Sequence, residues 1–188
     1  VTLDLVRGIA QDPNALARLE GLIVQSPAAL ASLACVVVLA APAIEELLKA
    51  IPLLLFARRS ALLTERVAIL IGVAGGVGFA FAENAGYLSM LADEWWIVFW
   101  LRAAAAVMHG VSSGYVGRAW YQAVDRGRWG ATLLDLLVGW GIHAAWDGLS
   151  LLAGWFADRG QVAGVLFCVL GGLIPLSLLF ALLARWGI

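Results

Sequence analysis

The sequence predicts an all-α membrane protein, a polytopic bundle of about six transmembrane helices with both termini in the cytoplasm. Of its 188 residues, 63% are hydrophobic and 13% are charged, whereas a soluble domain is about 45–50% apolar and 25% charged. Apolar segments long enough to cross a bilayer recur along the chain, and arginines gather in alternate loops. The net charge of -1 argues against a basic surface for nucleic acid.

The N-terminal part is predicted to lie on the membrane rather than to cross it. Residues 1–21 mix apolar and charged side chains around a turn signal at Asp12-Pro13-Asn14, which favours an amphipathic segment at the membrane face. No internal repeat or low-complexity linker divides the remainder, so residues 22–188 are expected to form a single transmembrane helical domain.

The first two spans are expected at 22–41 and 43–57. Pro42 separates them, and Pro52 should kink the second, because proline removes a backbone hydrogen bond and its ring collides with the preceding turn. Further spans are expected at 67–91, 95–121, 130–156 and 162–184. In the third, Gly72 and Gly76 form a small-xxx-small pair that permits close helix contact. The sixth carries no charge and should be interrupted at Gly171-Gly172 and Pro175.

The arginine distribution sets the expected orientation. With six spans, nine arginines fall on one side of the membrane, which the positive-inside rule makes the cytoplasm. They are Arg7, Arg18, Arg58, Arg59, Arg66, Arg118, Arg126, Arg128 and Arg185. The opposite loops hold Asp93-Glu94 and Asp158-Arg159. We therefore expect a multi-pass protein of the inner (cytoplasmic) membrane of a cell.

The strongest functional signal is a group of three charges inside an apolar stretch, Glu45, Glu46 and Lys49. A charged side chain at bilayer depth costs from about 2.5 to more than 10 kcal/mol and normally marks function. On a helix Lys49 lies one turn from both carboxylates, but adjacent residues point about 100° apart. One glutamate can therefore be paired while the other stays free for chemistry, and the spacing does not say which. A structural ion cluster is the alternative.

Other titratable groups lie at similar depth in later spans. Glu83 (followed by Asn84), His109 and His143 lie about 14 to 25 Å from the nearest cytoplasmic arginine, counted by helical rise. Asp147 lies one turn after His143, where it can fix the imidazole tautomer. Singly, each could be an interhelical hydrogen bond or a satisfied core residue. Agreement in depth favours one shared site.

Two further charges are expected to have no role in this site. Asp135 lies near the cytoplasmic end of its span, so capping or solvation is its default interpretation. Arg102 lies seven residues before His109 and near the outer interface, where snorkelling is expected.

Carboxylates and imidazoles without a thiolate suit a divalent ion, zinc being our expectation. Cys35 and Cys168 are interpreted as apolar packing residues. Such an ion can activate water at neutral pH, and so can a glutamate and histidine pair without a metal. A polar cavity hidden from lipid inside a bundle would admit that water.

These residues resemble the PrsW-type intramembrane metalloproteases, which are related to the CAAX prenyl protease and bacteriocin-processing superfamily. The family motifs EExxK, FxxxE followed by Asn, a later histidine and HxxxD/N match four segments in order. They are Glu45-Glu46-Leu-Leu-Lys49, Phe79-Ala-Phe81-Ala-Glu83-Asn84, His109 and His143-Ala-Ala-Trp-Asp147.

The resemblance implies a membrane-embedded peptidase with a membrane-protein substrate, and in PrsW itself site-1 cleavage of an anti-sigma factor. It implies that Glu45 or Glu46 activates water with Lys49 as partner, and that Asp147 orients His143. His109 and His143 would be metal ligands or oxyanion donors, and Glu83 a third ligand. A metal-free glutamate mechanism stays open, and the sequence does not give the oligomeric state.

The alternative function is a proton-coupled transporter or a catalytically inactive membrane scaffold of the same fold. Intramembrane carboxylates, histidines and lysines also build proton relays. Secondary transporters commonly contain internal repeats, and the chain shows none.

Overall fold

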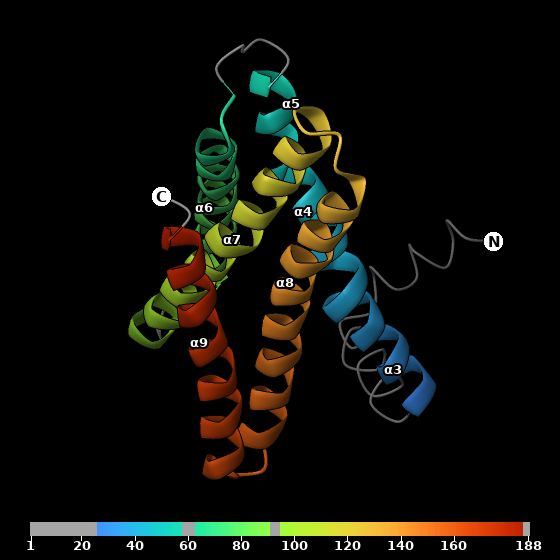
Figure 1. Cartoon of the computed structure of the whole chain (residues 1–188). Coiled ribbons are helices and arrows are strands. Elements are labelled where there is room, and N and C mark those ends of the chain that lie inside the picture. The colour runs from blue at the N-terminus through green and yellow to red at the C-terminus, as the bar shows by residue number, and fades with distance from the viewer. Residues whose placement is uncertain (1–25, 58–62, 91–94, 186–188) are drawn as a thin grey trace, which may run out of the picture.

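The computed structural model describes residues 26–57, 63–90 and 95–185, and within these ranges the chain is helical without strands (Figure 1). The predicted amphipathic segment 1–21 lies outside the described residues. The elements are α3 (Pro27–Cys35), the π-helix η1 (Val36–Ala40), α4 (Ala41–Lys49), α5 (Ile51–Ala57), α6 (Glu65–Met90), α7 (Trp95–Val124), α8 (Trp129–Ala157) and α9 (Val162–Arg185).

The predicted division of the first helical region at Pro42 is wrong. Elements α3, η1 and α4 run on into α5, and Pro27–Leu55 forms one candidate membrane span. The wider π turn of η1 ends two residues before Pro42. Such a turn changes the hydrogen-bond register, so the helix accommodates a proline that would break a regular ladder. The expected kink at Pro52 is confirmed, because α4 ends at Lys49 and α5 starts at Ile51.

The four later helices lie where the apolar segments predicted them. Elements α6, α7, α8 and α9 agree within three residues at each end with the spans expected from the sequence. The expected interruption of the last one is wrong, since α9 continues through Gly171-Gly172 and Pro175. A continuous helix satisfies its own backbone groups in a bilayer. Gly172 also packs closely against α8, where a Cβ added to it would lie 3.5 Å from the indole of Trp146.

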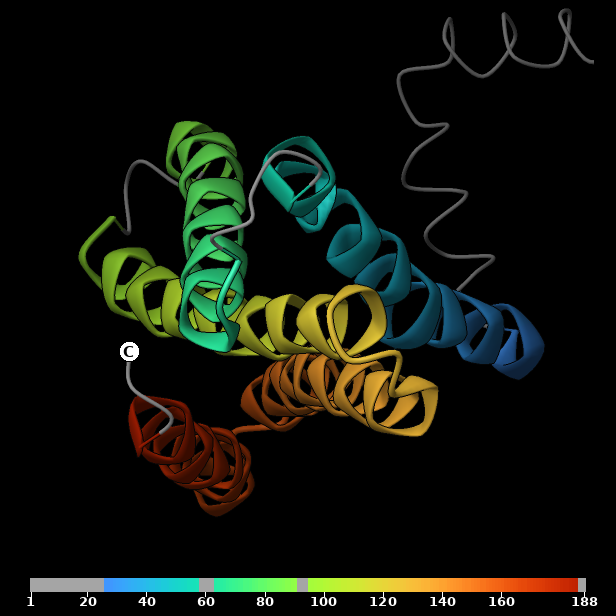
Figure 2. The same ribbon diagram turned by 45° about the horizontal axis from the view of Figure 1, so that its top comes forward.

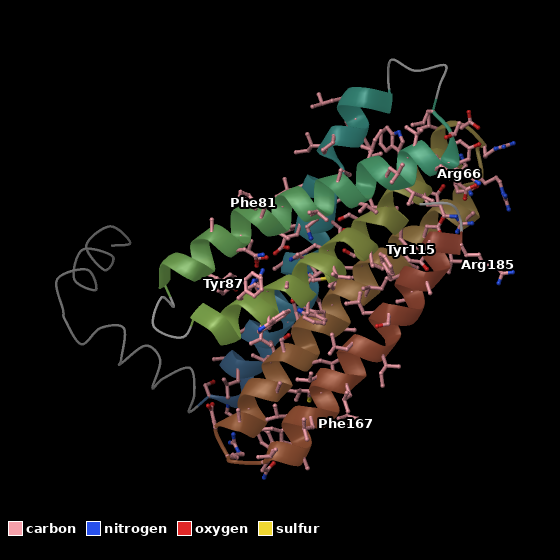
Figure 3. All side chains as sticks on the ribbon, turned by 90° about the vertical axis from the view of Figure 1, so that its left-hand side faces the viewer. Arg66, Phe81, Tyr87, Tyr115, Phe167 and Arg185 are labelled. Carbon is pink, nitrogen blue, oxygen red and sulfur yellow. The ribbon has the colours of Figure 1, made fainter. Side chains whose placement is uncertain are left out.

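The expected six spans with two cytoplasmic termini are not confirmed. Four helices of the described chain are long and apolar enough to cross a membrane, namely Pro27–Leu55, Glu65–Tyr87, Trp129–Ala157 and Val162–Ala181. Figure 3 shows Arg66 and Arg185 at the same end of the bundle and Phe167 toward the other. The start of α3 lies toward the Phe167 end, so the first and last described helices have their outer ends at opposite ends of the bundle.

Helix α7 is the centre of the bundle although it is not among those four spans. It is 30 residues long, and Figure 2 shows it with α6 and α3–α5 on one side and α8 and α9 on the other. Residues 108–117 are buried without a break. Because its neighbours shield it from lipid, α7 can carry polar residues in its middle that a lipid-facing helix could not.

The contact between α6 and α7 depends on small residues. A Cβ added to Gly72 would lie 2.1 Å from the Ser113 carbonyl oxygen, and one on Gly76 would lie 2.1 Å from that of His109. The predicted small-xxx-small pair is therefore confirmed as the place where the two backbones approach. This approach brings the backbone of His109 against α6.

The outer surface is strongly apolar. Large side chains are exposed on several helices, including Leu47 (69% exposed), Phe81 (78%) and Phe167 (74%), and Figure 3 labels the two phenylalanines. Monomeric soluble proteins rarely expose contiguous apolar patches of this kind, whereas lipid tails cover them at no cost. The fold thus places apolar side chains outside and polar ones inside.

Candidate active site

Four helices bring the sequence-predicted site residues to one place inside the bundle. Helix α4 supplies Glu45, Glu46 and Lys49, α6 supplies Glu83, α7 supplies His109, and α8 supplies His143 and Asp147. The two imidazole rings meet edge to face with centroids 4.7 Å apart. Groups from residue 45 to residue 147 are thus within a few ångströms of one another, which is what their common depth predicted.

Glu46 is the fixed centre of this site. Its Oε1 lies 2.9 Å from each of three donors, Lys49 Nζ, Ser112 Oγ and His143 Nδ1. Its Oε2 accepts from Ser113 Oγ at 3.0 Å. The residue is 5% exposed. A carboxylate with both oxygens occupied in this way is strongly held and has little capacity left to accept a further proton.

Lys49 joins helices that surround α4. Its Nζ lies 2.7 Å from His109 Nδ1 and 2.9 Å from Glu46 Oε1, and 4.6 Å from the ring centroid of Phe79 on α6. The side chain has no exposed surface. A buried ammonium needs such partners, because an unpaired one would be very costly in an apolar interior.

Glu45 differs from its neighbour in having spare capacity. Its Oε2 lies 3.4 Å from Lys49 Nζ and 3.5 Å from His143 Nε2, and this buried oxygen has no hydrogen-bond partner. The side chain is 24% exposed, against 6% for that of Glu46. Of the two carboxylates between which the sequence could not choose, Glu45 is the one with a free oxygen facing the histidines.

His109 is held by a carboxylate on the side of the ring away from Lys49. Its Nε2 lies 3.0 Å from Glu83 Oε2, and the same oxygen pairs with Arg102 Nη2. The expected snorkelling of Arg102 is therefore wrong. Its guanidinium turns into the bundle because Glu83 and Asn84, one helix away, offer it acceptors.

His143 is oriented mainly by Glu46. With Nδ1–H donating to Glu46 Oε1, the lone pair of Nε2 faces Glu45. Asp147 Oδ2 lies 3.6 Å from that Nε2, which is beyond hydrogen-bond range. The orienting role expected for Asp147 stays a prediction.

Comparison with protein families decides the identity of this arrangement. The model of the PrsW family intramembrane metalloproteases matches residues 12–174. The chain belongs to this family. It is therefore a hydrolase, a membrane-embedded protease, as its motifs predicted. Comparisons with curated proteins and with solved structures found no significant match.

Membership of the PrsW metalloproteases implies a divalent metal, and the donors fit one. Glu45, His109 and His143 each offer a ligand atom, and these atoms lie within 4.8 Å of one another. Glu45 Oε2 is buried without a hydrogen bond, with Lys49 Nζ 3.4 Å away, so it can accept a further cation. In this family member four carboxylates also meet only two cations, leaving two negative charges uncompensated when the imidazoles are neutral. The carboxylates are Glu45, Glu46, Glu83 and Asp147, and the cations are Lys49 and Arg102.

The structure adds residues to the PrsW motifs. Ser112 and Ser113 donate to the two oxygens of Glu46, a role that the sequence did not indicate, although two adjacent hydroxyls one turn after His109 were a usable signal. Asp135 was expected to cap its helix or meet solvent, and this is wrong. It is 3% exposed and accepts from Arg118 at 2.8 Å.

Proposed function

We propose that the chain hydrolyses a peptide bond of a membrane-protein substrate within the bilayer. The observation that carries this proposal is the meeting of Glu45, His109 and His143 in the bundle interior, with donor atoms close enough to share an ion. The surrounding surface is apolar, so a substrate reaches the site most directly from the membrane. Site-1 cleavage of an anti-sigma factor in the inner membrane is the specific version of this proposal.

Glu45 is proposed as the reacting carboxylate and Glu46 as its support. Glu46 accepts four hydrogen bonds, whereas Glu45 keeps a free oxygen next to His143. A general base needs an accessible lone pair within reach of the proton it takes. Lys49 holds the two carboxylates together and compensates one of their charges.

In the metal form of the mechanism Glu45 is a ligand rather than the general base, and with His109 and His143 it would hold the ion, zinc being the expected one for this donor set. Glu83 remains a candidate third ligand, although its Oε2 already faces Arg102 and His109. When bound, the ion would supply Lewis acidity and lower the pKa of a water molecule. Asp147 lies close enough to His143 Nε2 to stabilise a proton there after a small side-chain rotation. A metal-free glutamate mechanism would use the same groups.

Cleavage of a co-expressed, tagged single-pass membrane substrate tests the proposal. Glu45→Gln and His143→Ala should lower cleavage at least about 1,000-fold, the scale expected when a group essential to the chemistry is removed. The matched control is Ser177→Ala, because Ser177 lies exposed on α9 and donates to the Leu173 carbonyl of its own helix. Normal cleavage by both site variants, each present in the membrane at the wild-type level, would end the proposal.

Metal analysis of the purified protein separates the two forms of the mechanism. One zinc per chain that is lost in Glu45→Ala and retained in Glu83→Ala supports the set Glu45, His109 and His143. Loss in Glu83→Ala alone supports the ligand predicted from the sequence. Full cleavage by the wild type after exhaustive chelation contradicts a metal and leaves the glutamate mechanism.

A further inference from the structure

Arg102 is the charged residue next to the active site for which the family motifs quoted above give no role. Its side chain is 17% exposed, and a guanidinium at this depth would be costly without partners. Three residues of α6 surround it. Its Nε donates to Asn84 Oδ1 at 2.6 Å, its Nη2 pairs with Glu83 Oε2, and its guanidinium carbon lies 4.4 Å from the ring centroid of Tyr87. Tyr87 is labelled in Figure 3 beside the α6–α7 contact.

A single oxygen atom connects Arg102 to the active site. Glu83 Oε2 pairs with Arg102 and lies 3.0 Å from His109 Nε2. Arginine is not deprotonated in proteins, so its contact holds Glu83 as an ionised acceptor. Because Glu83 Oε2 is an acceptor, the proton of the His109 ring must lie on Nε2. The hydrogen bond at one ring nitrogen sets the tautomer.

The consequence appears at the other ring nitrogen. With the proton on Nε2, the lone pair of His109 Nδ1 accepts from Lys49 Nζ at 2.7 Å, in a residue that belongs to the group Glu45, His109 and His143. The opposite tautomer would place an N–H against the ammonium and leave no lone pair for a metal or a substrate proton. The tautomer and ring orientation of His109 therefore depend on Glu83, and the position of Glu83 depends on Arg102.

We propose that Arg102 is a positioning residue that acts through Glu83 to fix the tautomer and ring orientation of His109. The inference deepens the proposed function and rests on it for its catalytic meaning. It assigns Glu83 to the orientation of His109. The relay consists of three side chains on two helices, and Arg102 lies two turns before the histidine on the same face of α7.

Imidazole nitrogen NMR on the metal-free protein in micelles tests the relay without requiring activity. The chain contains two histidines, so histidine labelled with ¹⁵N in its ring gives two pairs of imidazole nitrogen signals, and His143→Gln assigns them. Wild-type His109 should show one protonated nitrogen, Nε2, and one bare nitrogen, Nδ1. In Arg102→Gln the two shifts should move toward an average as the tautomers mix, and Arg102→Lys should restore part of the difference.

Arg118→Gln is the matched control. Arg118 also lies on α7 and also pairs with carboxylates of neighbouring helices, Glu65 and Asp135, but the carboxylate that faces His109 Nε2 is a different one, Glu83. The Arg118→Gln variant should leave the His109 signals unchanged. If Arg102→Gln does not fold, Glu83→Gln tests the same relay from its middle and should mix the tautomers as well.

Zinc titration and cleavage kinetics give the functional outcome. Loss of a group that orients a metal-binding histidine typically costs about 10- to 100-fold in affinity or activity. We expect Arg102→Gln to weaken Zn²⁺ binding and to lower kcat within this range with KM little changed, and Arg102→Lys to recover part of both. Arg118→Gln should change neither.

Different experimental outcomes would overturn the inference and the proposed function. An unchanged His109 tautomer in Arg102→Gln and in Glu83→Gln overturns the inference, even when the wild type cleaves its substrate. Equal effects of Arg102→Gln and Arg118→Gln on His109 would reduce Arg102 to a packing residue and also overturn it. A changed tautomer in a protein that cleaves nothing supports the relay and contradicts the proposed function.

Discussion

Two polar clusters lie along α7, and they differ in what surrounds their charges. The active-site cluster contains Glu45, Glu46, Lys49, His109 and His143. The second, here called the Arg118 cluster, joins Glu65 on α6, Arg118 on α7 and Asp135 on α8 at distances of 2.8 Å. Both link three or more helices, and each leaves one buried carboxylate oxygen, on Glu45 or on Asp135, without a hydrogen bond.

The difference is that the active-site cluster also contains imidazoles, which bind transition metals and exchange protons near neutral pH. Two imidazoles face Glu45, whereas the Arg118 cluster consists of one permanently charged guanidinium and two carboxylates. In the described part of the chain the active-site cluster holds the one group of three ligand atoms able to share an ion. Charge inside a bundle can therefore serve helix assembly alone. We expect the proposed chemistry to need the two imidazoles as well.

Lys49→Met should have the largest effect on the folded state. Removing the cation leaves the carboxylate of Glu46 buried with only neutral partners, and breaking a buried ion pair in this way costs about 3–5 kcal/mol. Unfolding in mixed micelles with increasing dodecyl sulfate measures this free energy. The double variant with Glu46→Gln should regain much of the stability without regaining cleavage. Wild-type stability of Lys49→Met would show that this ion pair is not buried as described.

Gly76→Ala should have the second largest effect on the stability of the folded state. The added methyl group would lie 2.1 Å from the His109 carbonyl oxygen, so α6 and α7 must separate, and overpacking of this kind costs about 1–3 kcal/mol. Separation also moves His109 relative to Glu83, so cleavage should fall. Gly78→Ala is the matched control, because a Cβ there meets nothing within 4 Å. Equal unfolding free energies for the two alanine variants would contradict the described α6–α7 contact.

Arg118→Met should lower the stability of the folded protein and leave its catalytic activity nearly unchanged. We expect a loss of about 1–2 kcal/mol, less than for a fully buried pair because the Arg118 side chain is 25% exposed. Cleavage per folded molecule should stay within a factor of two of the wild type. Asp135→Asn in the same chain should recover part of the loss. A tenfold fall in the turnover of folded Arg118→Met would mean that the two clusters are coupled.

Ser113→Ala should have the smallest effect. It removes one donor to Glu46 Oε2, which is worth about 1 kcal/mol in stability. Because the second oxygen of Glu46 keeps its three donors, cleavage should fall only modestly. Thermal unfolding in detergent gives the first quantity, and initial cleavage rates give the second. A complete loss of cleavage would make Ser113 part of the chemistry rather than a support for Glu46.

The sequence predicted the later helices and most of the site because both depend on bilayer physics. Apolar length fixes where a helix can cross, which is why α6 to α9 agree with expectation. The cost of intramembrane charge singles out Glu45, Glu46, Lys49, His109 and His143 without any structure. Local rules failed at Pro42 and Pro175, where helices continue past residues that would end them in water.

Tertiary structure decided how the polar groups are paired. Glu45 and Glu46 are equivalent by spacing, and only the serines of α7 and His143 of α8 make Glu46 the saturated one. From the sequence alone, snorkelling explains Arg102, and helix capping or solvation explains Asp135. In the structure each of them instead forms an ion pair with a residue of another helix. The physical reason is that hydropathy is summed along one helix, whereas the partner of a buried charge lies on another.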